Sequence, residues 1–199
     1  MLGWFVHGRV TIAAAIVAAA VGAGGTALAL GTSPPPHVTS MPTAGRTQAA
    51  LKITSGTPVL DITVARLDGT LLRVSTPDSA PVRPELSGSR LILLSLVGAR
   101  SVPGHGSGSE YAVRVVLNSA ITWTIDLAGG ASQVLLSLPG GVPTQVVADG
   151  GAGYLSLDGQ SLTGVAGGTA LTTPGWATAT SRFAIDATAG VSRLAVSRW

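Results

Sequence analysis

Apolar and polar side chains alternate along much of the chain beyond residue 58. In Tyr111–Asn118 one side of the alternation carries Tyr, Val, Val and Leu, and in Ile121–Asp126 it carries Ile, Trp and Ile. A period of two is typical of a β-strand with one face buried and the other exposed. Leu91–Val97 is apolar on both faces, as in a strand that is covered on both sides. No segment beyond residue 31 shows a helical period, so we predict an all-β domain.

One spaced pattern occurs twice. The copies are Ile125-Asp126, Gly130 and Ser132 and, sixty residues on, Ile185-Asp186, Gly190 and Ser192. Each copy predicts a strand, a glycine turn and a second strand, and a looser copy begins at Val146. We expect Gly130 and Gly190 to adopt positive φ, and Asp126 and Asp186 to accept hydrogen bonds from turn amides. Short strands with turn signals at such intervals predict a β-solenoid, with a β-sandwich or a barrel as the alternatives.

Other turn signals lie in the first half of the domain. Asp68-Gly69 favours a tight hairpin between strands at Val59–Val64 and Thr70–Ser75. Three prolines then interrupt the pattern, so we predict a loop over residues 76–89.

The N-terminal region contains a long apolar run. Val10–Leu30 carries no charge and is long enough to cross a bilayer as one helix, with Arg9 on its short flank. Its length favours a retained anchor in the cytoplasmic membrane. The alternative is a signal peptide cleaved near Ala29, since Ala27-Leu28-Ala29 fits the small-x-small rule, which would give a secreted protein.

Three regions follow from these features. Residues 1–31 are predicted to be the membrane anchor or signal peptide. Residues 32–57, rich in Pro, Ser and Thr, are predicted to be an extended linker in which His37 has no partner for a site. Residues 58–199 are predicted to be an extracytoplasmic β-rich domain.

Composition excludes several classes of protein. Charged residues make up 11% of the chain, well below the ~25% of typical soluble domains, which argues against a helical bundle. The net charge of +3 comes from scattered arginines, whereas nucleic-acid-binding domains cluster their charge. The absence of cysteine excludes disulfides, thiolate metal sites and a catalytic Cys.

Three runs in the C-terminal half resemble a known family. They are ADGGAGYLSLDG (Ala148–Gly159), TGVAGGTALTTPGW (Thr163–Trp176) and SRFAIDATAGVSRLAV (Ser181–Val196). Together they look like the C-terminal half of the bacterial putative-adhesin domain family. The resemblance covers residues 58–198 and is strongest from Val113 onward. It implies short strands stacked in a solenoid-like or prism-like arrangement, often after a transmembrane segment, and a noncatalytic extracytoplasmic domain.

The sequence gives little support for a hydrolytic active site. A serine hydrolase would need a base, and the histidine of the predicted domain, His105, lies in a Gly-Ser loop without a Gly-x-Ser-x-Gly elbow. Paired carboxylates for glycoside cleavage are available, but we interpret them as turn residues. They are Asp126, Asp149, Asp158 and Asp186, with Asp78 and Glu85 in the proline-rich loop.

A calcium site and a sugar-stacking site are the remaining candidates. Gly150-Gly151-Ala152-Gly153 begins a calcium-binding β-roll pattern, but Leu155 occupies the position of the aspartate ligand. Trp123 is predicted to lie in the core, whereas Trp176 and Trp199 are candidates for exposure. The sequence therefore assigns no catalytic, cofactor-binding or metal-ligating residue, and no cofactor.

The predicted function is that of a noncatalytic, membrane-anchored envelope protein with an adhesin-like β domain. Its expected partners are the membrane and an unidentified envelope protein or glycan, and not nucleic acid. The alternative is an extracytoplasmic ligand-binding or sensory module, which a cluster of Trp176, Tyr154 and Arg182 on one face would favour. An envelope hydrolase is the third class and requires His105 and an aspartate to converge.

Overall fold

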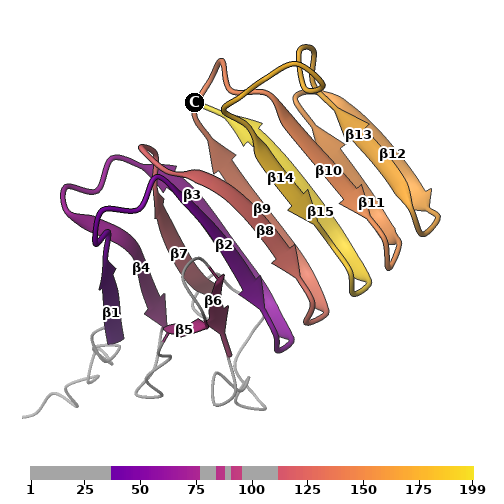
Figure 1. The fold of residues 1–199 in the computed structure, drawn as a ribbon. Helices are drawn as coiled ribbons and strands as arrows, with labels where there is room; N and C mark the ends of the chain where they lie inside the picture. Colours follow the sequence, from indigo (N-terminus) through magenta and orange to yellow (C-terminus); the bar gives the residue numbers. More distant parts are fainter. Residues whose placement is uncertain (1–36, 77–83, 88–90, 96–111) are drawn as a thin grey trace, which may run out of the picture. The chain divides into compact units, whose positions relative to one another are not determined.

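The computed structural model describes residues 37–76, 84–87, 91–95 and 112–199. These residues form two open mixed β-sheets (Figure 1). The strands are β1 (His37–Pro42), β2 (Gln48–Ile53), β3 (Thr57–Ala65), β4 (Thr70–Thr76), β5 (Pro84–Ser87), β6 (Leu91–Leu94), β7 (Ala112–Asn118), β8 (Thr122–Leu127), β9 (Ala131–Leu138), β10 (Thr144–Ala148), β11 (Ala152–Leu157), β12 (Gln160–Val165), β13 (Thr169–Thr172), β14 (Phe183–Asp186) and β15 (Val191–Arg198). The prediction of an all-β domain is confirmed.

Each sheet has a defined strand order. Sheet A has eight strands in the order β1-β4-β7-β3-β9-β15-β11-β12, and sheet B has seven in the order β13-β10-β14-β8-β2-β6-β5. The described residues contain no helix with the length and apolar character needed to cross a bilayer. The predicted anchor, Val10–Leu30, lies outside the described residues.

Most strands belong to a unit that we call a rung, in which a strand of sheet B is followed by a strand of sheet A. The rungs of the described residues are β2/β3, β6/β7, β8/β9, β10/β11 and β14/β15. Neighbouring rungs pair in parallel in both sheets. Antiparallel strands flank the stack at both ends: β4 and β5 pair with β7 and β6, and β12 and β13 pair with β11 and β10.

The order of the rungs in space differs from their order in the chain. From one end of the stack to the other, the rungs are β6/β7, β2/β3, β8/β9, β14/β15 and β10/β11. The last rung of the chain therefore lies between two earlier ones, as Figure 1 shows for β15. A solenoid whose turns follow one another would keep the order of the chain, so the structure is described by two mixed sheets rather than by a simple succession of turns.

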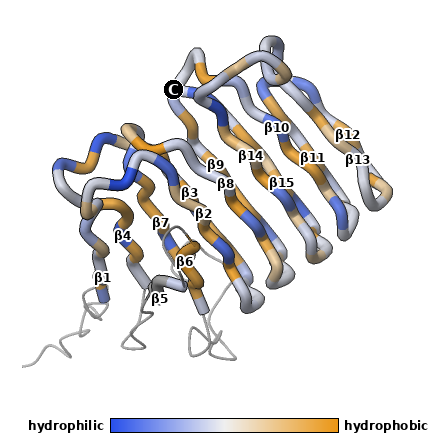
Figure 2. Tube along the Cα trace, in the orientation of Figure 1, coloured by the Kyte–Doolittle hydropathy of each residue, from blue (hydrophilic) through white to orange (hydrophobic). Residues whose placement is uncertain are grey.

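Buried side chains of both sheets form one hydrophobic core. Leu51, Ile125, Ile185 and Val146 occupy one row across sheet B, and each is at most 1% exposed. Figure 2 shows the alternation of apolar and polar residues along the strands. Trp123 lies in this core as predicted, and its indole Nε1 donates a hydrogen bond to the Asn118 carbonyl at 2.9 Å.

Two predictions of irregular structure are wrong in part. The predicted linker, residues 32–57, contains β1 and β2, and in β2 every second residue, Ala49, Leu51 and Ile53, enters the core. The surrounding Pro, Ser and Thr residues obscured this alternation. The predicted loop, residues 76–89, contains the end of β4 and all of β5.

Candidate functional site

The two copies of the Ile-Asp pattern lie side by side in neighbouring rungs. Ile185 pairs with Ile125 and Asp186 with Asp126 across the parallel strands β14 and β8. Beyond the turn the alignment continues in sheet A, where Val191 pairs with Ala131. The repeated spacing therefore marks a structural unit built twice and stacked in register.

Asp126 is held by its neighbours on both sides. The ammonium of Lys52, on β2, donates to its Oδ2 at 2.7 Å, and the Thr188 hydroxyl donates to its Oδ1. Burial acts to raise the pKa of Asp126, but these hydrogen bonds and the charge of Lys52 outweigh it and hold that pKa below its usual value. The hydrogen bonds come from side chains of neighbouring rungs, not from turn amides as expected.

Asp186 occupies the equivalent position but has a different environment. Its pKa is raised, first by burial and then by the charges of Asp149 and Asp126 and a hydrogen bond with Asp149, although Lys52 partly offsets this. Its Oδ1 is buried and has no hydrogen-bond partner among the described residues. Two carboxylates in equivalent positions thus differ in the direction of their pKa shift.

The glycines of the turns permit close approach of neighbouring rungs. A Cβ on Gly150 would lie 2.4 Å from the carbonyl carbon of Ala189, and a Cβ on Gly129 would lie 2.2 Å from that of Ser55. Such separations are below any van der Waals contact, so only glycine fits without movement of the backbone. These glycines are therefore explained by packing between rungs.

The positive φ predicted for Gly130 and Gly190 is not observed. A Cβ on Gly190 would lie 3.2 Å from the Gly150 carbonyl oxygen, and one on Gly130 would lie 3.4 Å from that of Gly190. Their conformation does not require glycine, and their surroundings are less tight than those of Gly150.

Asp158, which follows β11, forms an ion pair with Arg198 near the end of β15. Arg198 Nε lies 3.0 Å from both carboxylate oxygens of Asp158. The same guanidinium donates to the carbonyls of Pro139 and Val142 at 3.1 and 2.7 Å and to the Thr144 hydroxyl at 3.0 Å. Arg198 thus joins the C-terminal rung to the segment that connects β9 and β10.

The calcium-like pattern also has a structural explanation. Gly150 and Gly151 form the turn between β10 and β11, and Leu155, at the position of the aspartate ligand, is fully buried in the core. Within the described parts of the chain, no group of three or more His, Cys, Asp or Glu is arranged to hold a metal ion.

Two arginines stack on aromatic rings at different sheets. The Arg182 guanidinium lies 4.8 Å from the centroid of the Trp176 ring beside sheet B, and that of Arg193 lies 4.4 Å from the centroid of Tyr154, on neighbouring strands of sheet A. Distances of this size are favourable for a cation–π interaction. The expected cluster is therefore divided: Trp176 and Arg182 meet, and Tyr154 lies at the other sheet.

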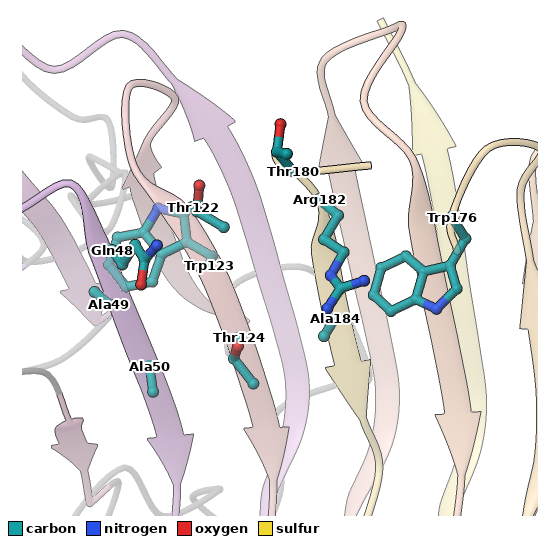
Figure 3. A pocket seen from close by; sticks show the side chains of 10 residues that line it. All are labelled: Gln48, Ala49, Ala50, Thr122, Trp123, Thr124, Trp176, Thr180, Arg182 and Ala184. Carbon is teal, nitrogen blue, oxygen red and sulfur yellow. The ribbon is translucent and has the colours of Figure 1, made fainter. Parts of the chain in front are cut away.

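Trp176 and Arg182 border a pocket of about 360 Å³ (Figure 3). Its other lining residues are Gln48, Ala49, Ala50, Thr122, Trp123, Thr124, Thr180 and Ala184. The sequence offered Trp176 and Arg182 as candidates, but it gave no signal that Ala50 and Thr124 would lie beside them, because β2 and β8 are far apart in the chain.

Only two of the four remaining candidates lie among the residues that the structure describes. His105 and Asp78 lie outside the described residues. Glu85 is an exposed residue of β5, and Trp199 is 66% exposed at the chain end.

Comparison with known proteins assigns no family. Neither a protein-family model nor a curated protein matches the chain. The crystal structure of a putative cell adhesion protein from Clostridium sporogenes is similar with a TM-score of 0.42 and 12% sequence identity, over 83% of this chain and 100% of that one. At this level of similarity the comparison establishes neither a family nor a function.

Proposed function

We propose that this protein is a noncatalytic, adhesin-like interaction protein of the cell envelope. Val10–Leu30 anchors it in the cytoplasmic membrane, and the β domain that follows lies outside the cytoplasm. The apolar run and its positively charged flank support this location.

The proposal rests on a difference between two sets of charged side chains: one set forms ion pairs between rungs, and the other is exposed. Three ion pairs connect neighbouring rungs: Lys52–Asp126, Arg114–Asp61 and Arg198–Asp158, at 2.7, 3.3 and 3.0 Å. Asp126 and Asp158, two of the candidate acids, are therefore occupied in holding the stack together. Arg182 and Arg193, which stack on aromatic rings, are exposed, so a partner can reach them.

Location is tested by fractionating the full chain and a variant that lacks residues 1–33. The full chain is expected with the membranes and the truncated chain in the soluble fraction. Membrane association of the truncated chain would contradict a single anchor at Val10–Leu30. A mature N-terminus at Leu30 would show cleavage after Ala29 and a secreted protein.

The interaction role is tested by comparing the attachment of cells with and without the gene to isolated envelope material. Cells that produce the protein are expected to attach more strongly. Equal attachment would overturn the adhesin-like role, and a hydrolytic activity abolished by His105→Ala would overturn the noncatalytic assignment.

The pocket at Trp176 and Arg182 favours the second candidate, a ligand-binding module. An adhesin attaches the cell to another surface, whereas a ligand-binding module holds a smaller molecule. The residues that line this pocket indicate the class of ligand that the pocket fits.

A further inference from the structure

The floor of the pocket is a row of small side chains. Ala50, Thr124 and Ala184 are aligned in register across β2, β8 and β14 (Figure 3). Each of these strands is hydrogen-bonded to a neighbour on both sides. Their backbone groups are therefore already paired, and a ligand above them has to be recognised by side chains.

The wall of the pocket carries one cation and no acid. Arg182 stacks on Trp176, and no described carboxylate forms an ion pair with it. No lining residue is an aspartate or a glutamate. The guanidinium is thus positioned to bind an anion through two parallel hydrogen bonds.

The remaining lining groups suit a ligand rich in hydroxyls. The side chains of Thr122, Thr124 and Thr180 supply hydroxyls that both donate and accept hydrogen bonds. The Trp176 ring supplies an aromatic surface, and the volume of about 360 Å³ lies in the range of small-molecule sites.

We propose that this pocket binds an acidic saccharide, with the carboxylate of a uronic acid residue on Arg182 and its hydroxyls on the threonines. The inference rests on the proposed function, because it names the class of partner through which the domain would attach. A flat floor of Ala and Thr offers no deep apolar recess for peptide side chains and no free strand edge for a peptide backbone. These features favour a sugar over a peptide.

The test measures binding of trigalacturonate to the purified full chain in detergent by isothermal titration calorimetry, with neutral maltotriose as the comparison. Arg182→Gln and Trp176→Ala are each expected to weaken binding of trigalacturonate by about tenfold or more, because they remove a charge-assisted hydrogen bond or the ring that positions it. Maltotriose is expected to bind at least tenfold more weakly than trigalacturonate, by the same argument.

The other arginine–aromatic pair supplies the matched control. Arg193→Gln removes the same charge, and Tyr154→Ala removes the ring that Arg193 stacks on, but neither residue lines this pocket. Both variants are expected to bind trigalacturonate as the unaltered chain does. Melting temperatures of all four variants establish that each is folded.

Three results would overturn the proposal. They are no binding of trigalacturonate, equal weakening by Arg182→Gln and Arg193→Gln, and equally tight binding of a tripeptide through its terminal carboxylate. The attachment of cells to envelope material is measured in a separate assay. Failure of the saccharide site and failure of the adhesin-like role are therefore distinguishable.

Discussion

The rungs β8/β9 and β14/β15 carry the same sequence pattern and stack on each other, yet their chemistry differs. In β8/β9, Asp126 is paired with Lys52 and its pKa is lowered. In β14/β15, Asp186 faces Asp149 and its pKa is raised. The comparison teaches that a repeat in sequence specifies the position of a side chain on its rung, whereas the next rung specifies its partner.

The largest effect is expected where the turns of neighbouring rungs touch. Gly150→Ala would place a Cβ 2.4 Å from the Ala189 carbonyl carbon and 2.4 Å from the Gly190 nitrogen. Both are backbone atoms, so the rungs must separate locally, and we expect a loss of about 3 kcal/mol in the free energy of unfolding. Chemical denaturation measures this loss.

Gly130→Ala is the matched control for the same turn in another rung. Its Cβ would lie 3.4 Å from the Gly190 carbonyl oxygen, an ordinary contact, and the φ angle of Gly130 is not positive. We expect a change below ~1 kcal/mol. Equal losses for both variants would show that the close approach does not explain the glycine at position 150.

The second effect concerns the ends of the two aligned strands. Arg198 of β15 pairs in register with Leu138 of β9, which is fully buried. Arg198→Met keeps an unbranched stem but removes every hydrogen bond of the guanidinium, including those to two backbone carbonyls. Because a partly buried polar group that loses its hydrogen-bond partner destabilises the fold, we expect a loss of about 2 kcal/mol in the free energy of unfolding.

The control for Arg198 is an arginine in an exposed pair. Arg66 and Asp68 lie 3.3 Å apart, with their side chains 88% and 92% exposed. Arg66→Met is expected to change the free energy of unfolding by less than ~0.5 kcal/mol. If Arg198→Met changed the free energy of unfolding as little as Arg66→Met, the contacts of Arg198 with the β9–β10 connection would contribute little to stability.

Local features of the sequence predicted many of the strands and their buried faces, but not β1, β2 and β5. The alternation at Ile121–Asp126 corresponds to β8. The apolar run at Leu91 corresponds to β6, which ends at Leu94, but burial alternates along β6 and the expected cover on both faces is not observed. The buried face of Ile125 and the core position of Trp123 also follow from this alternation. A side chain's direction along a strand depends only on its immediate neighbours in the chain, so a single sequence contains that information.

Pairing between rungs was not predictable in the same way. Each rung presents a similar apolar face, so nothing local indicates that β14/β15 lies between β8/β9 and β10/β11. The partner of Asp126 is Lys52, 74 residues away in the chain. The pocket at Trp176 depends on the same long-range order, because its floor combines three strands that are distant in sequence.

The smallest effect tests the two aspartates directly. Asp126→Asn removes the charge that pairs with Lys52, and we expect a loss of less than ~1 kcal/mol at pH 7. Asp186→Asn removes a charge that faces Asp149, and we expect the melting temperature to rise at pH 7. The two substitutions are chemically identical and occupy equivalent positions, so opposite signs would come from the neighbouring rung alone.

The pH dependence gives the sign of each contribution separately. The folded state raises the pKa of Asp186, so its contribution to stability is fully present below the ordinary aspartate pKa and is lost as the pH rises through the raised value. The folded state lowers the pKa of Asp126, so its contribution is present above the ordinary pKa and is lost as the pH falls through the lowered value. Thermal melts between pH 3 and pH 7 should therefore show the advantage of Asp186→Asn shrinking toward low pH, and the deficit of Asp126→Asn shrinking as well. A gain from Asp186→Asn that stayed constant over this range would mean that its charge is not the cause, and that the two rungs differ in packing rather than in electrostatics.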